Sequence, residues 1–447
     1  MEWRLIGSRG ASMLVKLLKK CAAQVVTMLV RWGWPSLGRL MLMLEQSVST
    51  RRRQQHLLKF NSVAEGAEQL SARVQAVVPA RSLALLPIRR AGTNAELTER
   101  REHQVDLPAV CITEFRDMRI IGGSEMLCTK DGVLLYDEIA LGDPDRYGCK
   151  AFGIIPAQGF GRHLPACKNG RVLISHHHPE RVPITRGIHL CKDHSGNYFH
   201  WLFECLPRAI VTMQYAEYAG FPLLVDAHLP EQNLQALEQI AAGREIMHIG
   251  HRDLHRVGAL VFPGVFSYMH DNYGNEVEPG DLLIAPEAVI LLRKTYLQNL
   301  GRVGFKKLFV ARDSAKYRRL RNEKQLQEAM VAHGFEIVRP ENLSFAQQVE
   351  LFSSASVIIG PTGAGLSNMV FSPEGCKVIV LAGATLGANT FIFGQLGQWL
   401  KHDLIYLTGP AMHPGKLHSD YTINLDELCV LLAKMPITPH AAKSEAA

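Results

Sequence analysis

The clearest indication of how this chain folds is the stretch Gly360-Pro-Thr-Gly-Ala-Gly-Leu-Ser-Asn368. An apolar run, Ser356–Ile359, precedes it directly, and a second one, Cys376–Leu381, follows it. This order indicates a buried strand, a glycine turn, a short helix and another buried strand. Such a turn directs free backbone N–H groups and the positive end of a helix at one spot, where α/β proteins hold phosphate or diphosphate.

The same alternation of strands and helices continues on both sides of the glycine turn. We expect strands at 307–311, 335–338, 356–359, 377–381 and 404–407, and helices at 286–300, 322–333, 344–354, 391–400 and 425–433. Gly334 is placed to end one helix and Ser344 to cap the next. The pattern predicts a doubly wound, Rossmann-like unit.

An earlier part of the chain, from about residue 110, has a different pattern of apolar residues. Short apolar runs at 110–112, 118–121 and 132–136, separated by glycine turns, predict a small antiparallel meander. Further strands are expected at 171–175, 187–191, 222–225, 245–249 and 259–262, with a helix at 234–242. This β/α alternation implies a second, parallel sheet. The chain becomes polar and glycine-rich at 274–281, where we place a boundary.

The segment Asn197–Arg208 reads as a helix that carries ionisable side chains. His200 and Glu204 are four residues apart and therefore share one face of a helix. Arg208 lies one turn further along, and Pro207 is expected to kink the helix between them.

The segment Arg312–Glu323 begins at the carboxyl end of an expected strand, where open α/β sheets bind their ligands. Guanidinium groups make bidentate, permanently charged contacts to phosphate oxygens. Arg312, together with Arg318 or Arg319, could neutralise a diphosphate without a metal ion. The alternative is a solvated basic loop in which Asn322 caps the following helix.

Composition limits the class of protein and of ligand. The chain has 447 residues, 47% hydrophobic and 20% charged, which excludes collagenous, fibrous and disordered proteins. A net charge of +7 suits an anionic ligand or a membrane surface. The arginines are not interleaved with aromatic residues as in nucleic-acid modules, so we expect no nucleic-acid partner. The 9 cysteines include no C-x-x-C pair, as in a cytosolic protein with reduced thiols.

Residues 1–104 lack the clear alternation of the later chain. Lysine, arginine and tryptophan among apolar residues at 13–44 suit a helix lying on an anionic membrane surface, or one packed on this protein or a sister subunit. Residues 50–105, rich in Arg, Gln, Glu and Ala, predict a solvated, partly helical connector. Two apparent metal motifs, Asp143-Pro-Asp145 and His176–His178, are better interpreted as a turn and as surface or substrate-rim residues.

Four blocks in order resemble glycosyltransferase family 61, of the bacterial capsular or surface polysaccharide type. They are N-Y-F-H-W-L-F-E-x-L-P-R at 197–208, R-x5-R-R-x2-N-E at 312–323, G-F-E-I-V-x-P-E at 334–341 and G-P-x-G-A-G-L-x-N at 360–368. The resemblance implies an α/β, GT-B-like fold with two Rossmann-type domains facing a cleft. We accordingly divide the chain into an N-terminal helical extension and connector (1–104), an acceptor-side domain (105–280) and a donor-binding domain (281–447).

The resemblance also implies the site residues. By motif position, the residues that bind substrate or donor are Arg208, Arg312, Arg318, Asn322, Glu323, Thr362, Gly363, Ala364, Gly365 and Asn368. His200, Glu204 and Arg208 are placed at the cleft between the domains. Two positions depart from the family pattern. Thr362 stands where histidine is frequent, and Val380 where a glutamate is common. A carboxylate at the latter position would suit ribose hydroxyls, so the departure bears on the identity of the donor.

The implied reaction is inverting, metal-independent transfer of a hexosyl, pentosyl or N-acetylhexosaminyl group from a nucleotide-sugar donor, with no cofactor. Inversion needs a base for the acceptor hydroxyl and cations for the departing diphosphate. We assign the base to His200, with Glu204 either orienting it or replacing it; the alternative is that His200 only bonds within the core.

The expected acceptor is a glycan or lipid-linked glycan of a surface or capsular polysaccharide. The expected location is the cytoplasm, with a peripheral contact of the N-terminus at the inner face of the plasma membrane. Two other functions stay open at this point. One is a different group transferase acting on glycans, such as a pyruvyl transferase, and the other is a non-catalytic subunit that binds nucleotide sugar or glycan.

Overall fold

The computed structural model describes residues 54–93, 102–137, 154–155, 164–167, 171–176, 180–251, 253–269, 279–298, 300, 305–312, 315–385, 391–416 and 418–434. The basic segment at 13–44, the pair Asp143 and Asp145, and His177 with His178 lie outside these residues. Within the described residues, no helix combines the length and the apolar character needed to cross a lipid bilayer.

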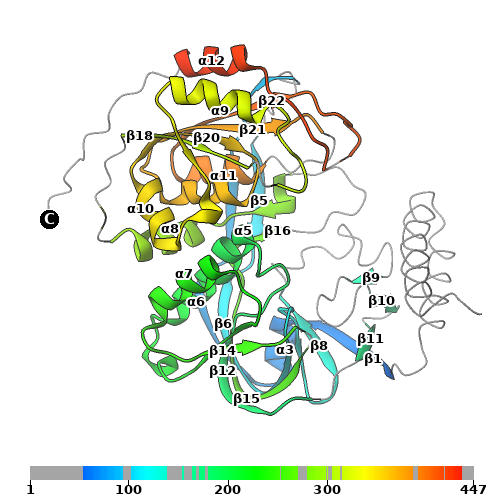
Figure 1. Ribbon diagram of the computed structural model, residues 1–447. Coiled ribbons are helices and arrows are strands. Elements are labelled where there is room, and N and C mark those ends of the chain that lie inside the picture. The colour runs from blue at the N-terminus through cyan, green and yellow to red at the C-terminus, as the bar shows by residue number, and fades with distance from the viewer. Residues whose placement is uncertain are drawn as a thin grey trace, which may run out of the picture.

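The later half of the chain forms a sheet of six parallel strands (Figure 1). Their order is β19 (Glu336–Val338), β18 (Lys306–Val310), β20 (Ala355–Pro361), β21 (Lys377–Gly383), β22 (Asp403–Gly409) and β4 (Arg90–Gly92). All seven residues of β20 are buried, as expected for a parallel strand covered on both faces. The predicted α/β, doubly wound unit is confirmed here.

Helices cover both faces of this sheet. On one face α9 (Glu323–Ala332) and α12 (Leu425–Lys434) pack through buried leucines. On the other face lie α8 (Pro286–Tyr296), α10 (Phe345–Ser353) and α11 (Phe391–Trp399). Ser344 begins α10 with the predicted cap, completed by Gln347 as a capping box.

The order of the strands reverses between β18 and β20. From β18 the chain passes through α9 to β19 on one side, and then through α10 to β20 on the other side of β18. From β20 it continues through η6 (Ala364–Phe371) to β21, further from β18. The loops that follow β18 and β20 therefore meet at the carboxyl edge of the sheet, at the switch point where such folds bind ligands.

The earlier half forms a mixed sheet of twelve strands. Its parallel part comprises β14 (Ile246–Ile249), β13 (Leu223–Asp226), β12 (Ile184–His189) and β15 (Leu254–Pro263). The predicted meander is β6 (Val110–Ile121), β7 (Leu127–Cys128) and β8 (Val133–Tyr136), which pair antiparallel and join the sheet along β15. The outer strands β11 (Arg171–His176), β10 (Leu164–Cys167) and β9 (Ile154–Ile155) follow beyond β1.

The range 50–105, expected as a solvated, partly helical connector, is mostly strand in its described residues and contains one short helix. They form β1 (Gln54–Ser62), a short helix α3 (Val63–Gln69), β2 (Arg73–Val78), β3 (Arg81–Leu85), β4 and β5 (His103–Leu107). β1 joins β8, β2 joins β6 and β4 joins β22, so this segment contributes to both large sheets. Charged residues stand at exposed positions of these strands, such as Arg73 in β2 and Asp106 in β5, which concealed the strand pattern in the sequence.

Helices of the two halves meet between the sheets (Figure 1). α5 (Tyr198–His200), α6 (Leu206–Thr212) and α7 (Glu231–Ala241) come from the earlier half and face α8 and α10. The largest apolar cluster contains residues of both sheets, such as Ile188 and Val380. The division into two GT-B domains with a boundary near residue 280 stays a prediction.

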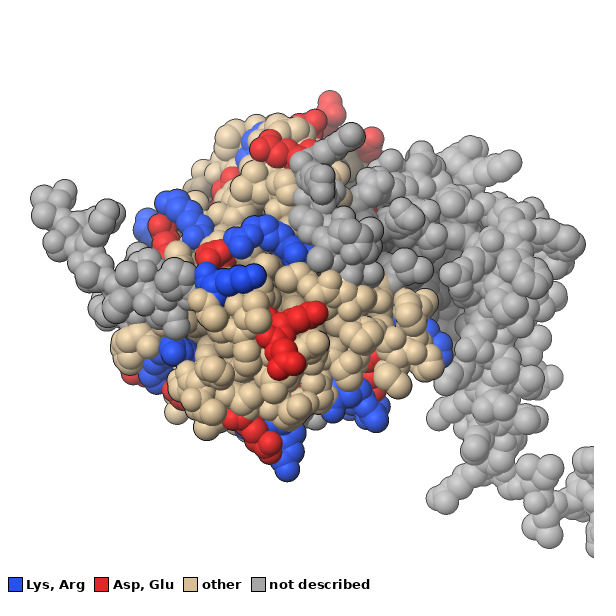
Figure 2. Space-filling model, turned by 90° about the horizontal axis from the view of Figure 1, so that it is seen from above, with Lys and Arg blue, Asp and Glu red and all other residues tan. Residues whose placement is uncertain are grey.

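Charge is dispersed on the face that carries α9 and α12. Seen from that side, lysine and arginine side chains alternate with carboxylates and with broad uncharged areas (Figure 2). The net charge of +7 is therefore not gathered into one wide basic field on this face.

Candidate functional site

The two turns at the switch point touch each other. Arg312 follows β18, and its side chain lies against the backbone of Gly363, which follows β20. A Cβ added at Gly363 would lie only 2.7 Å from Nε and 2.8 Å from Cδ of Arg312. The predicted juxtaposition of Arg312 and the glycine turn is confirmed, and only glycine permits so close an approach.

Arg312 is held in place by hydrogen bonds within its own loop. Its Nη1 donates to the carbonyl oxygens of Tyr317, at 2.9 Å, and Arg318, at 3.1 Å. Its backbone N–H donates to Oε1 of Glu323 at 2.5 Å. Burial lowers the pKa of the Arg312 guanidinium, which nevertheless stays cationic at neutral pH. The loop therefore presents a fixed positive charge at the carboxyl edge of the sheet.

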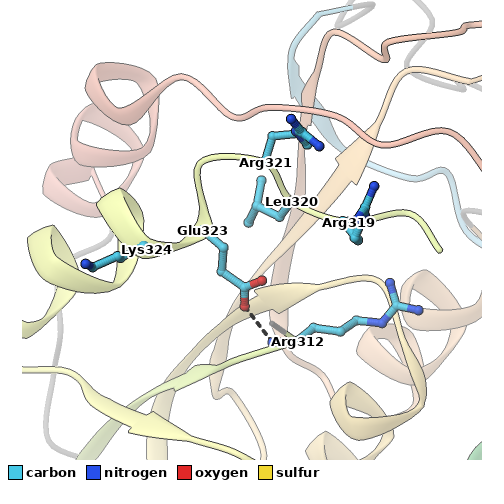
Figure 3. Close-up of a pocket in the computed structure, with 6 residues that line it drawn as sticks. All are labelled: Arg312, Arg319, Leu320, Arg321, Glu323 and Lys324. Atoms are coloured by element: carbon cyan, nitrogen blue, oxygen red, sulfur yellow. Dashed lines mark hydrogen bonds between the residues drawn. The ribbon is translucent and has the colours of Figure 1, made fainter. Parts of the chain in front are cut away.

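A pocket of about 220 Å³ opens beside this arginine (Figure 3). It is lined by Arg312, Arg319, Leu320, Arg321, Glu323 and Lys324. Figure 3 shows the carboxylate of Glu323 turned toward the backbone of Arg312, while Lys324 extends away on the opposite side. Four cationic side chains and one carboxylate line the pocket, and Asp420 pairs with two of the cations, Arg319 and Arg321. The excess of positive charge that remains suits an anion.

The segment after β22 fixes the arginine loop. Oδ2 of Asp420 accepts from Nε and Nη2 of Arg319 at 3.0 and 2.7 Å, and Oδ1 accepts from its backbone N–H at 2.9 Å. Asn322 pairs with the backbone of Ile423, accepting at 3.1 Å and donating at 2.8 Å. The cap expected from the Asn322 side chain on α9 does not form, because that amide is engaged with Ile423. Sequence reasoning missed Asp420, which lies about a hundred residues from its partner.

The glycine turn leads into a 3₁₀ helix, η6, rather than an α-helix. Thr362 donates its N–H to the carbonyl of Leu381 at 2.9 Å and so belongs to the sheet edge. The first bond of the following turn runs from the N–H of Leu366 to the carbonyl of Gly363 at 3.1 Å. The amides of Gly363, Ala364 and Gly365 precede this bond, as orphan donors do at a helix start. They are the groups of the turn that could bind an anion.

Asn368 joins the two halves of the molecule. Its Oδ1 accepts from the hydroxyl of Tyr198 in α5 at 2.7 Å. Its Nδ2 donates to Oε1 of Gln348 at 2.7 Å and to the carbonyl of Gly365 at 3.1 Å. Asn368 is fully buried, and its hydrogen bonds hold the glycine turn in place, while its expected contact with the donor stays a prediction.

The helix that bears His200 is interrupted by a π-helical turn. α5 begins at Asn197, whose side chain accepts from the N–H of Phe199. Residues Trp201–Cys205 form the π-turn η2, in which Leu206 donates back to the carbonyl of Trp201. Pro207 has no N–H for the normal helical bond, so the predicted kink takes the form of a π-turn. Such turns are frequent at functional sites.

His200 and Glu204 form a buried pair, as their spacing predicted. Nδ1 of His200 lies 2.8 Å from Oε1 of Glu204. The other carboxylate oxygen of Glu204 contacts Nζ of Lys192 at 3.2 Å, and Lys192 also contacts Oε1 of Glu125 at 3.3 Å. Burial alone would raise the pKa of Glu204, but His200 and Lys192 together lower it to about 2. Glu204 is therefore an ionised acceptor that fixes the Nδ1–H tautomer of His200.

Lys192 comes from the loop after β12, which Asp226 at the end of β13 holds in place. Oδ2 of Asp226 accepts from the hydroxyl of Ser195 at 2.6 Å and from the N–H of Lys192 at 3.0 Å. In the same loop, the ring of His194 stacks on His200 with centroids 5.4 Å apart. Sequence reasoning missed Lys192, Glu125 and Asp226. Only Lys192 left a signal, since it directly follows the strand expected at 187–191.

Arg208 lies in the interior of the protein. It is fully buried, and Nε donates to the carbonyl of Pro263 at 2.7 Å while Nη2 donates to that of His189 at 3.0 Å. Its guanidinium also lies over the ring of Phe262. In this structure the Arg208 side chain ties α6 to β12 and β15, and its expected role in binding substrate or donor stays a prediction.

Residues 198–379 match the model of a protein family described as Glycosyltransferase 61. The match begins in α5, ends in β21 and includes both the His200–Glu204 pair and the contact of Arg312 with Gly363. No curated protein matches the chain.

Proposed function

Because residues 198–379 match the Glycosyltransferase 61 family model, we propose that this chain is an inverting, metal-independent glycosyltransferase that uses a nucleotide-sugar donor. We propose as acceptor a glycan or lipid-linked glycan of a surface or capsular polysaccharide. The transferred group is a hexosyl, pentosyl or N-acetylhexosaminyl residue. The reaction would take place at the cytoplasmic face of the membrane, with the basic N-terminal segment as a peripheral contact.

The observation that carries this proposal is the contact of Arg312 with Gly363 at the switch point. A diphosphate bound there would meet a fixed guanidinium and the amides at the start of η6. Both favour the negative charge that grows on the leaving group as the glycosidic bond breaks. The neighbouring pocket, with Arg319 and Arg321, adds positive charge to the same edge.

The base in this proposal is His200. Its Nδ1–H is bound to Glu204, so Nε2 would take the proton of the acceptor hydroxyl. The hydroxyl oxygen then bonds to the anomeric carbon, and the electron pair of the broken bond leaves with the diphosphate. Glu204 is an unsuitable base, because its pKa of about 2 and its two engaged oxygens leave it little affinity for a proton. Its role is orientation.

Donor binding is tested by thermal denaturation with a panel of sugar nucleotides, since a ligand that binds the folded state raises Tm. We expect one class to stabilise the protein and Arg312→Ala to weaken its binding roughly tenfold to a hundredfold, as for a lost charged hydrogen bond. Arg181→Ala is the matched control, because Arg181 is a half-exposed arginine paired with Asp253 in the other sheet. If no sugar nucleotide shifts Tm, or if both variants bind alike, the donor site is misplaced.

The base is tested by turnover of the donor found in that screen. His200→Ala should reduce kcat by roughly a hundredfold or more while donor affinity is unchanged. Near-normal kcat in this variant would rule out His200 as the base.

A non-catalytic, nucleotide-sugar-binding subunit is the second candidate. Val380 lies fully buried within β21, where the family commonly has a glutamate, so this chain offers no carboxylate at that position. Tight donor binding without turnover would favour this function. Transfer of a pyruvyl group, without any binding of sugar nucleotides, would instead indicate another glycan-modifying transferase.

A further inference from the structure

An exposed tyrosine stands beside the cationic edge and has no part in the core. Tyr317 is 60% exposed, although it belongs to the same loop as the hydrogen-bonded Arg312 and Arg319. Its ring is tilted by 35° over that of His418, with centroids 5.6 Å apart. An aromatic pair open to solvent, in the same loop as an arginine that lines a charged pocket, is an arrangement typical of sites that bind a flat, polar ring.

The backbone places this pair next to the proposed diphosphate site. Nη1 of Arg312 donates to the carbonyl oxygens of both Tyr317 and Arg318. The backbone of Tyr317 therefore contacts the same guanidinium that lies against Gly363. Across the pair, the N–H of Arg318 donates to the carbonyl of His418 at 3.4 Å. The backbone of Tyr317 and the guanidinium of Arg312 are therefore held together within one loop.

Arg318 adds an independent sign of function. Its φ is +53°, in the left-handed region that costs a residue with a Cβ about 1 kcal/mol or more. Its Nε is buried and has no hydrogen-bond partner among the described residues. Backbone strain that persists together with an unpartnered cationic donor is common where a loop is shaped for a ligand.

His418 contributes a ring rather than another charge. Burial, with help from Arg318 and Arg312, lowers the pKa of its imidazole. The groups facing it are the phenol of Tyr317 and these two guanidiniums. At neutral pH the ring is neutral, so it supports Tyr317 as a flat surface without repelling the neighbouring arginines.

We propose that Tyr317, supported by His418, is the stacking platform for the nucleobase of a nucleoside diphosphate whose phosphates lie against Arg312 and Gly363. This inference rests on the proposed function, because it assigns the second half of the same donor. Stacking uses the π-face that every base has, so the platform supplies affinity and leaves the choice of base to other contacts.

The experiment compares uridine, guanosine and adenosine diphosphates with inorganic pyrophosphate, by calorimetric titration of the full chain. Tyr317→Ala should weaken binding of the preferred nucleoside diphosphate about tenfold, with pyrophosphate affinity unchanged, while Tyr317→Phe keeps wild-type affinity for both. Phe305→Ala is the matched control, since Phe305 is a similarly exposed aromatic residue at the opposite end of β18.

The outcomes separate the two proposals. If the nucleoside diphosphate binds wild type and Tyr317→Ala equally, the platform is wrong and the donor site stands. If Tyr317→Ala loses pyrophosphate as well, Tyr317 only shapes the loop, and the stacking role is overturned. If neither nucleotide nor pyrophosphate binds wild type, the proposed function itself fails.

Discussion

At the scale of single residues, the site depends on charges that are buried but paired. Lys192 lies between Glu204 and Glu125, and His200 takes the remaining oxygen of Glu204. An unpaired charge at such depth would be costly, so each member depends on the others. The pairing gives His200 a defined tautomer, which an isolated histidine at the same position would lack.

From the ion pair of His200 with Glu204 we predict how the free energy of unfolding depends on pH. Burial raises the pKa of Glu204, but His200 and Lys192 lower it to about 2, below the ~4.3 of an unfolded glutamate. Ionised Glu204 therefore stabilises the fold above about pH 4.3, and this contribution is lost as pH falls toward 2. We expect Glu204→Gln to lower the free energy of unfolding at pH 7 by roughly 2–4 kcal/mol, and the gap to wild type to narrow between pH ~4.3 and 2.

Urea unfolding at pH 7, 4 and 3 measures that gap. Glu374→Gln serves as the control, because Glu374 forms an exposed pair with Lys401 and should change stability little at any of these pH values. A gap of the same size at pH 7 and pH 3 would mean that Glu204 is already protonated in the folded protein.

At the scale of elements, the glycine turn after β20 and the arginine loop after β18 act as one unit. A methyl group at Gly363 would collide with the middle of the Arg312 side chain, so Arg312 must move in Gly363→Ala. We expect this variant to lose donor affinity by roughly tenfold, and the double variant to lose no more than Arg312→Ala alone. Titration of all three proteins checks this; additive losses would show that the two turns act separately.

The sequence predicted most elements around these turns, because local signals specify them. The buried apolar runs of β20 and β21 and the Ser344 cap of α10 are readable within a few residues. β4 was missed, since it pairs with β22 over a separation of more than three hundred residues. The same reason applies to the site: the i, i+4 spacing indicated His200 with Glu204, whereas Lys192 and Glu125 come from other elements. Arg208 and Asn368 carried no sign of their complete burial.

At the scale of the whole molecule, the proposed base and the proposed donor site belong to different sheets. His200 stands on a helix of the earlier sheet, whereas Arg312 and Gly363 follow strands of the later one. Packing of α5 against η6 connects them, and the shared apolar core makes that contact firm. Catalysis by this arrangement requires that the two halves keep a fixed relation, because small misplacements of a reacting group reduce rates strongly.

Removal of the Tyr198 hydroxyl tests whether the two halves must keep a fixed placement, since its hydrogen bond to Asn368 crosses directly from α5 to η6. Tyr198→Phe removes one buried hydrogen bond while keeping the ring, so we expect a loss of about 1 kcal/mol in the free energy of unfolding. Donor affinity should change little, because Arg312 and Gly363 stay together, whereas kcat should fall roughly tenfold as His200 loses its alignment with the donor. Tyr296→Phe is the control: its hydroxyl also bridges the halves, but it donates to the carbonyl of Ala236 in α7 rather than to η6. An equal fall of kcat in both variants would mean that general loosening, and not the α5–η6 contact, limits the reaction.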